Sequence, residues 1–152
     1  MNIYHISISV QELLDDCSAQ VSLDFRALRA LSDQSPDVVY EDYVLSTDEQ
    51  EPFIAEFKSA VSELCAKFSS SMRLRVFTED RFSADISVWG HLPQAVTDRL
   101  IYEWVKVRML IWWYRQRNVD LWQKYTVRLG ELASEIGSFG SPACTTRRLR
   151  YF

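Results

Sequence analysis

The sequence has few of the residues on which catalytic and cofactor sites are usually built. Its 152 residues include only two histidines and four glycines. Neither His5 nor His91 has a second histidine or a glutamate at the helical spacing that binds zinc. None of the glycines belongs to a Gly-rich loop followed by Lys-Ser/Thr, which a phosphate cradle requires. We therefore expect no catalytic residues, no metal and no cofactor, and predict that the protein is not an enzyme.

Cysteines are also scarce, and their arrangement excludes two further classes of protein. The three cysteines, Cys17, Cys65 and Cys144, are an odd number at wide spacing. Such a set fits neither a disulfide framework nor a zinc site with paired ligands. We expect two of these thiols to be small core residues and the third to lie in a tail.

The chain lacks long hydrophobic runs. Its longest weakly charged stretch, Val105–Tyr114, contains Lys106 and Arg108 and is much shorter than the roughly 20 apolar residues of a spanning helix. Residues Met1–Val10 have no basic residue ahead of an apolar run, and no small-residue cleavage site follows. We expect no membrane segment, no secretory signal and synthesis in a reducing cytoplasm.

What the sequence does contain is enough apolar residues for one core and an uneven distribution of charge. Hydrophobic residues make up 47% of the chain, which suits one domain at this length. Residues Met1–Thr97 hold 7 Lys/Arg against 16 Asp/Glu, whereas Asp98–Phe152 hold 10 against 5. This polarity can steer association with an acidic surface, including that of an identical neighbour, or it can simply solvate exposed helix faces.

Hydrophobic spacing predicts a mainly α fold, namely a four-helix bundle-like domain with a small β-hairpin between its second and third helices. Residue types at helix starts place the four N-termini near Ser9, Ser46–Pro52, Pro93 and Asn118. Alternating apolar and polar residues predict the hairpin near 73–89. Residues 1–137 are therefore expected to form one helical domain.

Extended arms are predicted at both ends of this domain. Tyr4, Ile6 and Ile8 alternate with polar residues in a short β-prone opening. Residues 138–152 are rich in Gly, Ser, Thr and Arg and form a basic C-terminal tail. The two strands of the predicted hairpin are marginal alone, so they need the helices or a neighbour's strand to cover them.

The third predicted helix is apolar around most of its circumference. Such a helix must be buried nearly all round, so it either lies centrally or has one side covered by another subunit. It carries most of an aromatic cluster that can serve as core or as interface anchors. Within it, Trp112, Trp113 and Tyr114 are candidate partner-interface residues, and Trp113 and Tyr114 are expected to face the partner.

The second candidate interface is the end of the sequence. It consists of three arginines followed by two aromatic residues, which are Arg147, Arg148, Arg150, Tyr151 and Phe152. A basic segment with aromatics can pair with an acidic protein, contact nucleic-acid phosphates, or stay solvated. All three possibilities remain open at the level of sequence.

The order of these features resembles a known family. Ser46-Thr47-Asp48-Glu49 opens a helix with Phe57 and Ala60; a strand, a Trp-rich third helix, a fourth helix and an Arg-rich end follow. Over Tyr43–Phe152 this order is similar to that of small head-tail connector or adaptor proteins (neck-ring, head-completion proteins) of tailed phages, especially those of Bacteroides-type hosts. One departure is that the sequence ends in Arg147–Phe152, which is more hydrophobic than the family's basic ends.

The resemblance implies a structural virion protein. Such proteins form rings beneath the portal, with helices packed side by side and extended termini reaching adjacent subunits. The expected partners are copies of the same chain in a homo-oligomeric ring, the portal, and other neck or tail proteins, with possible non-specific DNA contact in the lumen. The expected location is the portal vertex of the virion, and the host cytoplasm before assembly.

A second function class competes with this interpretation. The net positive charge of Asp98–Phe152 and its terminal arginines also fit a cytoplasmic nucleic-acid-binding regulatory protein that uses the basic C-terminal region. A salt-dependent DNA affinity that disappears when Arg147, Arg148 and Arg150 become Ala distinguishes this alternative from a ring subunit.

Overall fold

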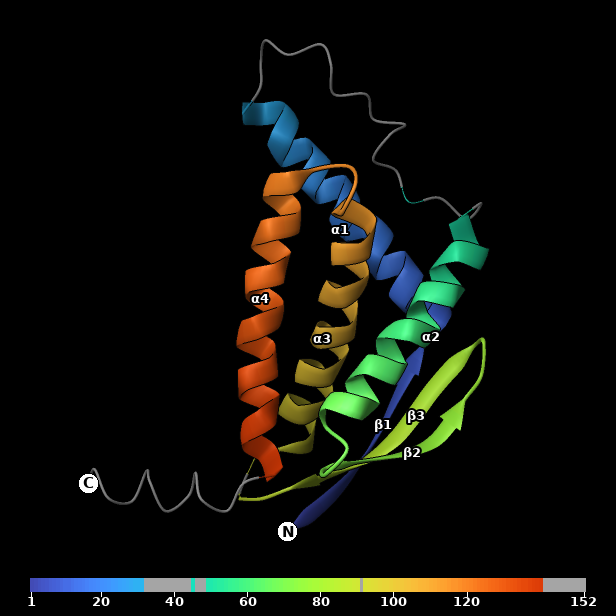
Figure 1. Cartoon of the computed structure of the whole chain (residues 1–152), viewed down its shortest axis with the longest axis vertical. Coiled ribbons are helices and arrows are strands. Elements are labelled where there is room, and N and C mark those ends of the chain that lie inside the picture. Colours follow the sequence, from blue (N-terminus) through green and yellow to red (C-terminus); the bar gives the residue numbers. More distant parts are fainter. Residues whose placement is uncertain (32–44, 46–48, 91, 141–152) are drawn as a thin grey trace, which may run out of the picture.

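A computed structural model describes residues 1–31, 45, 49–90 and 92–140 of the chain. The elements are β1 (Asn2–Ser9), α1 (Val10–Leu31), α2 (Gln50–Lys67), β2 (Met72–Phe77), β3 (Arg81–Val88), α3 (Gln94–Tyr114), α4 (Val119–Gly137) and the short 3-10 helix η3 (Ser138–Gly140) (Figure 1). The predicted mainly α fold with four helices and a hairpin between the second and third is confirmed. The hairpin spans 72–88, which is one residue earlier than predicted.

The N-terminal segment is extended, as predicted, but it does not project as an arm. It forms strand β1, which pairs antiparallel with β3 along its whole length, and the sheet order is β1-β3-β2. Ile6 and Ile8 are each 3% exposed on the face that also carries Phe82 and Ile86. A hairpin alone is marginal in water and was expected to need the helices or a neighbour's strand. The helices cover one face of it, and the chain's own first strand pairs with it.

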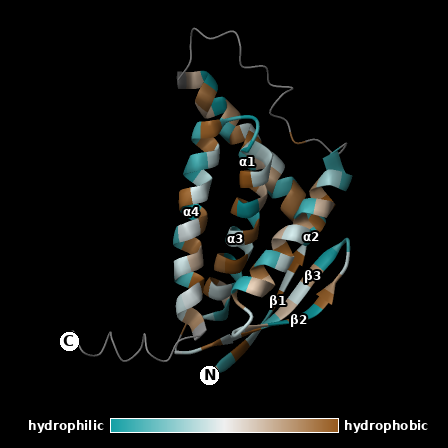
Figure 2. Ribbon diagram, viewed as in Figure 1, coloured by the Kyte–Doolittle hydropathy of each residue, from teal (hydrophilic) through white to brown (hydrophobic). Residues whose placement is uncertain are grey.

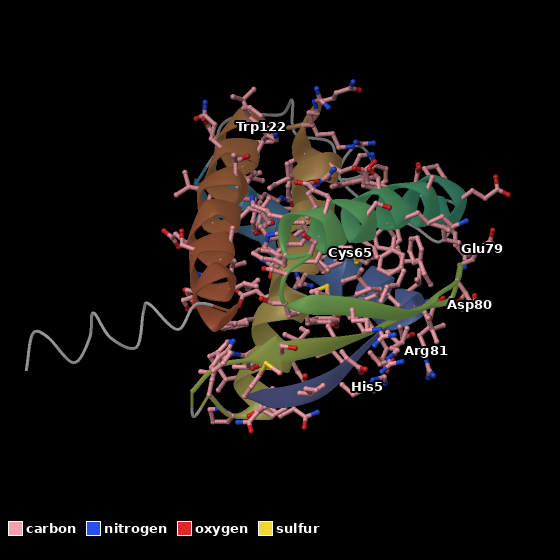
Figure 3. The ribbon with its side chains drawn as sticks, turned by 60° about the horizontal axis from the view of Figure 1, so that its bottom comes forward. His5, Cys65, Glu79, Asp80, Arg81 and Trp122 are labelled. Atoms are coloured by element: carbon pink, nitrogen blue, oxygen red, sulfur yellow. The ribbon has the colours of Figure 1, made fainter. Side chains whose placement is uncertain are left out.

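The helices pack on one face of this sheet, and no described helix covers the other face. The covered face is apolar, and the buried residues on it are Ile6, Ile8, Met72, Phe82, Ala84, Ile86 and Val88. The open face carries the polar residues His5, Ser7 and Asp85, and it also exposes Ile3 at 66%. His5 and Arg81 are labelled at the sheet in Figure 3. Figure 2 shows hydrophobic and hydrophilic residues alternating along the helices. The sheet is therefore amphipathic, as expected for strands with alternating side chains.

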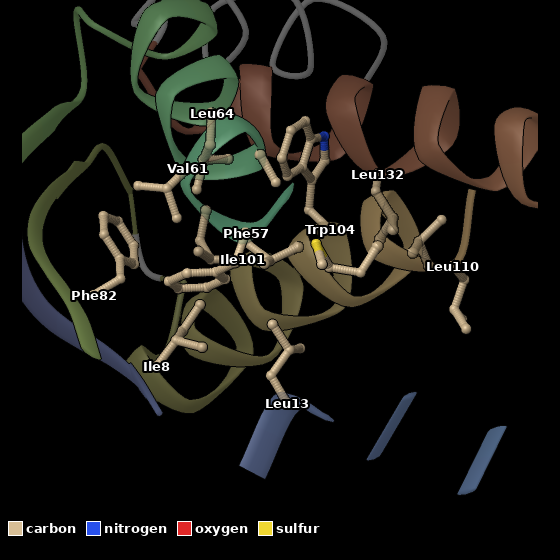
Figure 4. Packing of buried hydrophobic residues seen from close by; sticks show 14 of the residues in the cluster. Ile8, Leu13, Phe57, Val61, Leu64, Phe82, Ile101, Trp104, Leu110 and Leu132 are labelled. Atoms are coloured by element: carbon tan, nitrogen blue, oxygen red, sulfur yellow. The ribbon is translucent and has the colours of Figure 1, made fainter. Parts of the chain in front are cut away.

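Helix α3 lies at the centre of the molecule. It packs against α1, α2, α4 and β1, and its side chains Trp104, Val105 and Tyr114 are fully buried. Around Trp104 the close-up shows Phe57 and Leu132, which come from α2 and α4 (Figure 4). Of the two explanations for its apolar circumference, the central position is the one observed. The chain covers this helix without help from another subunit.

A buried carboxylate joins three of the helices. Asp24 of α1 accepts hydrogen bonds from Tyr114 Oη of α3 at 2.9 Å and from Tyr125 Oη of α4 at 2.6 Å. Gln20 donates to its other oxygen at 3.1 Å. The two tyrosine rings are stacked with centroids 5.8 Å apart. Because buried charge is tolerated only when it is hydrogen-bonded, these donors fix how the helices meet.

Helix starts agree with the sequence where the structure describes them. Asn118 caps α4, since its side chain accepts a hydrogen bond from Leu121 N at 3.0 Å. Pro93 is the residue before α3 rather than its first residue. Part of the predicted start at Ser46–Pro52 lies outside the described residues, and α2 begins at Gln50. No helix in the described part of the chain is long and apolar enough to cross a membrane.

The Asp24 network predicts a large loss of stability on truncation. Asp24→Ala removes the acceptor of two buried tyrosine hydroxyls, and we expect it to lower the free energy of unfolding by about 3 kcal/mol. Tyr125→Phe, which removes one donor and keeps the ring stack, should cost about 1 kcal/mol. Urea denaturation followed by circular dichroism measures both, and equal stability of Asp24→Ala and wild type contradicts the role of the network.

Candidate functional site

The structure places Trp113 and Tyr114 in the core rather than at a partner interface. Trp113 is 2% exposed and Tyr114 is fully buried, because the last turn of α3 lies between α1 and α4. The Arg117 guanidinium lies 3.6 Å from the centre of the Trp113 ring. Trp112 is partly buried and meets Phe53 edge-on at 6.3 Å. The expectation that Trp113 and Tyr114 face a partner is therefore corrected.

The candidate residues at the end of the sequence are outside the described part of the structure. Arg147, Arg148, Arg150, Tyr151 and Phe152 all belong to the undescribed residues 141–152. Their partner stays a prediction.

A different apolar surface is exposed on the hairpin. Leu74, Val76 and Phe77 of β2 are 45%, 42% and 37% exposed. We call these three side chains, together with the outer backbone edge of β2, the hairpin edge. In the order β1-β3-β2, no described strand pairs with that edge. Open edges with apolar side chains are templates for a strand from another chain.

The opposite edge of the sheet, formed by β1, is partly covered. Gln94 Nε2 at the start of α3 donates to the His5 carbonyl at 3.2 Å. Tyr4 Oη donates to the Leu92 carbonyl at 2.6 Å, and Asn2 Nδ2 donates to the Gly90 carbonyl at 3.3 Å. Residues near the start of α3 therefore contact β1, whereas no described strand pairs with the hairpin edge.

A β-bulge explains why Val76 lies on the open face of the sheet. The register against β3 shifts between Leu74, which faces Ala84, and Val76, which faces Ser83. Opposed residues share a face, so Leu74 lies on the helix-covered side and Val76 on the open side. Regular alternation along a strand would place Leu74 and Val76 on the same face. Bulges and the flanking Arg73 and Arg75 also limit which strands can pair with an edge.

Four side chains on the open face of the sheet form a hydrogen-bonded chain across all three strands. His5 Nδ1 lies 2.9 Å from Asp85 Oδ1, and His5 Nε2 lies 3.1 Å from Ser83 Oγ. Arg75 Nε donates to Asp85 Oδ2 at 2.6 Å. We call these residues the strand clamp. Sequence reasoning missed it because His5 is far from Ser83 and Asp85 in the chain, and only the strand register brings them together.

The clamp has the spacing of a Ser-His-Asp triad, but its environment favours a structural role. Ser83 is 3% exposed, so a substrate carbonyl does not reach its hydroxyl in this arrangement. Hydrogen bonds from His5 and then from Arg75 hold the pKa of Asp85 below its usual range. A carboxylate engaged on both oxygens serves mainly to tie β1, β3 and β2 together.

Neither of the two cysteines in the described part of the chain has the properties of a reactive thiol. Burial raises the pKa of the Cys17 thiol to about 12, and burial also raises the pKa of Cys65. Such thiols carry little thiolate at neutral pH. Within the described residues there is no group of three or more side chains that could hold a metal ion.

No protein-family model, no curated protein and no solved structure matches this chain. The geometry of its own residues therefore carries the functional argument.

The strand clamp makes stability depend on acid pH. The folded pKa of Asp85 is lowered, so its contribution is complete above its unfolded pKa of about 4 and is lost as pH falls through the folded value. We expect Asp85→Asn to melt at a lower temperature than wild type at neutral pH. The difference should shrink below about pH 4, where the wild-type carboxylate becomes protonated.

Thermal unfolding by circular dichroism across this pH range measures the effect. Asp80→Asn in the adjacent β2–β3 turn removes a carboxylate outside the clamp and serves as the matched control. Melting curves of Asp85→Asn and wild type that stay a constant interval apart at every pH contradict the clamp.

Proposed function

We propose that this chain is a structural virion protein, a subunit of a homo-oligomeric head-tail connector (neck) ring that joins the portal to the tail around the DNA passage. The observation that carries the proposal is the hairpin edge. The domain has a complete core of its own, yet the outer edge of β2 carries exposed apolar side chains and pairs with no described strand. The neck ring of a phage virion is suggested by the resemblance of the order of elements to that of connector proteins.

A self-contained core suits a subunit that folds before it assembles. Because α3 is covered by the same chain, burial of the core does not wait for a neighbour. The surfaces available for assembly are then peripheral ones, such as the hairpin edge. This differs from obligate oligomers, in which the interface completes the core.

The hairpin is held against the body, so that its edge is presented in one position. Thr78 N donates to the Arg81 carbonyl at 3.0 Å and closes the turn. Lys58 of α2 lies 3.4 Å from Glu79. The strand clamp fixes β2 to β3 through the Arg75–Asp85 ion pair. A preorganised edge loses less conformational entropy when a partner binds.

Surface charges favour a head-to-tail contact over a symmetric one. Glu12, Asp15 and Asp16 are exposed along α1, whereas Arg73 is exposed on the open face of the sheet without an ion-pair partner among the described residues. Two different surfaces of opposite charge pair heterologously, and heterologous contacts close into rings when the rotation permits. This supports a cyclic assembly of identical subunits.

The alternative function, a cytoplasmic nucleic-acid-binding regulatory protein that uses the basic C-terminal region, has less support in the described residues. Arg108 pairs with Glu56 and Glu63, both at 2.8 Å. Arg128 pairs with Glu103 at 2.9 Å and Glu131 at 3.2 Å. These two arginines of the net-basic half are therefore neutralised within the domain, which leaves less free charge for phosphates.

The ring proposal predicts that a charge on the hairpin edge prevents assembly. We expect Val76→Asp to shift the protein from oligomer to monomer in size-exclusion chromatography with light scattering. The matched control is Val127→Asp on α4, which replaces another exposed valine and should leave the oligomer intact.

The virion part of the proposal needs its own measurement. Mass spectrometry of purified particles should detect the chain, and negative-stain microscopy of the purified protein should show closed rings. A strict monomer within particles, absence from particles, or equal behaviour of Val76→Asp and Val127→Asp contradicts the proposal.

A further inference from the structure

We propose that the segment Arg147–Phe152 of a neighbouring copy occupies the hairpin edge as a fourth, antiparallel strand. This inference rests on the proposed self-assembly and names the part of the neighbour that makes the contact. Four observations lead to it: the sequence of the segment, the openness of the edge, the charges at its two ends, and the reach of the chain.

The first observation is that Arg147–Phe152 has nearly the sequence of a strand in this same protein. Strand β2 reads Met-Arg-Leu-Arg-Val-Phe, and residues 147–152 read Arg-Arg-Leu-Arg-Tyr-Phe. The two segments are identical at four of six positions, and Val76 is replaced by the equally β-prone Tyr151. A sequence pattern that forms a strand once in this chain is suited to form one again when a template is present.

The second observation is that the hairpin edge offers such a template. Its outer backbone groups face no described strand, and apolar side chains emerge on both faces of β2 because of the bulge. A strand laid along this edge gains main-chain hydrogen bonds. With Arg147 beside Phe77, its Leu149 and Tyr151 lie on the same side of the sheet as Leu74 and can cover that side chain.

The third observation sets the direction of the added strand. Beyond Phe77, the turn of the hairpin carries Glu79 and Asp80, which are exposed. An antiparallel segment places Arg147 and Arg148 beside this acidic turn. A parallel segment in matching register would instead set its Arg-Leu-Arg beside the Arg73-Leu74-Arg75 of β2, and neighbouring like charges destabilise a sheet. The charges therefore favour the antiparallel direction.

The fourth observation favours a neighbour over the same chain. Trp89 N donates to the Phe139 carbonyl at 2.8 Å, so the last described residues lie at the Val88 end of β3. Arg147 of an antiparallel strand lies at the opposite end, beside Phe77 and Phe82. Because Ser87 N and Trp89 N point to the same side of β3, Phe139 already lies on the β2 side. The distance is therefore about 23 Å along β3 and about 5 Å across one strand spacing, or about 24 Å in a straight line.

The seven residue steps from Gly140 to Arg147 reach at most about 25 Å when fully extended. The same chain would use all of them to reach Phe77 and would have no residues left for the reversal of direction that an antiparallel strand requires. A neighbouring copy is under no such restriction. Head-to-tail donation of this segment from each copy to the next also agrees with a ring.

Disulfide trapping in the full chain tests the proposal. The background carries Cys65→Ser and Cys144→Ser and retains Cys17, which is 1% exposed. In this background, Val76→Cys combined with Arg148→Cys should give a ladder of covalently linked chains after mild oxidation. The matched variant Val76→Cys with Tyr151→Cys probes the parallel direction, and it should link roughly tenfold less, because a held pair reacts at a much higher effective concentration.

The remaining outcomes separate the two proposals. Linked monomers, detected as thiol loss without a change in chain size, overturn the assignment to a neighbour. Dimers from Val76→Cys alone identify β2 of a second copy as the occupant and also overturn it. If the first variant forms oligomers but no disulfide links, the proposed fourth strand is contradicted and the proposed ring is not. If it forms neither oligomers nor links, both proposals are contradicted. Circular dichroism confirms that each variant is folded.

Discussion

Burial of α3 by the rest of the same chain is the constraint on which this structure depends. Trp104 and Tyr114 are fully buried, and the helix is surrounded by α1, α2, α4 and β1. The Trp104 indole Nε1 has no hydrogen-bond partner among the described residues, so apolar packing holds this side chain. The same burial removes Trp113 and Tyr114 from the set of surfaces that a partner can contact.

The remaining architecture follows from covering this helix. The α4 helix meets it through the stacked pair Tyr114 and Tyr125, and α1 meets both through Asp24. The sheet covers the remaining apolar surface with its inner face and turns a polar face outward. With the core complete, exposed apolar side chains remain on β1, α1 and α4 as well as on the hairpin edge, where they lie beside backbone groups that no described strand pairs with.

Local features of the fold were predictable from the sequence, whereas pairings between distant segments were not. Helical spacing and residues such as Asn118 identified the four helices, because the periodicity of a helix is contained in its own residues. The hairpin was found within one residue for the same reason. Pairing of β1 with β3, in contrast, joins residues about 80 positions apart, and no local pattern specifies that partner.

The candidate site shows the same division. The strand clamp depends on His5 meeting Ser83 and Asp85 through the register, and the exposure of Val76 depends on a bulge. Neither the strand clamp nor the exposure of Val76 can be predicted from the spacing of residues within one segment. The aromatic residues of α3 were recognised as core or interface, and only the arrangement of neighbouring helices decides between these roles for each residue.

Hydrogen–deuterium exchange of the protein, compared between dilute monomer and concentrated assembly, tests the central claim most directly. The claim is that α3 is buried by the rest of its own chain and that the hairpin edge is the surface that binds a neighbouring copy. It predicts that α3 amides exchange slowly in both states, while amides of β2 exchange quickly in the monomer and slow down on assembly. Slower exchange in α3 on assembly, with no change in β2, would contradict it.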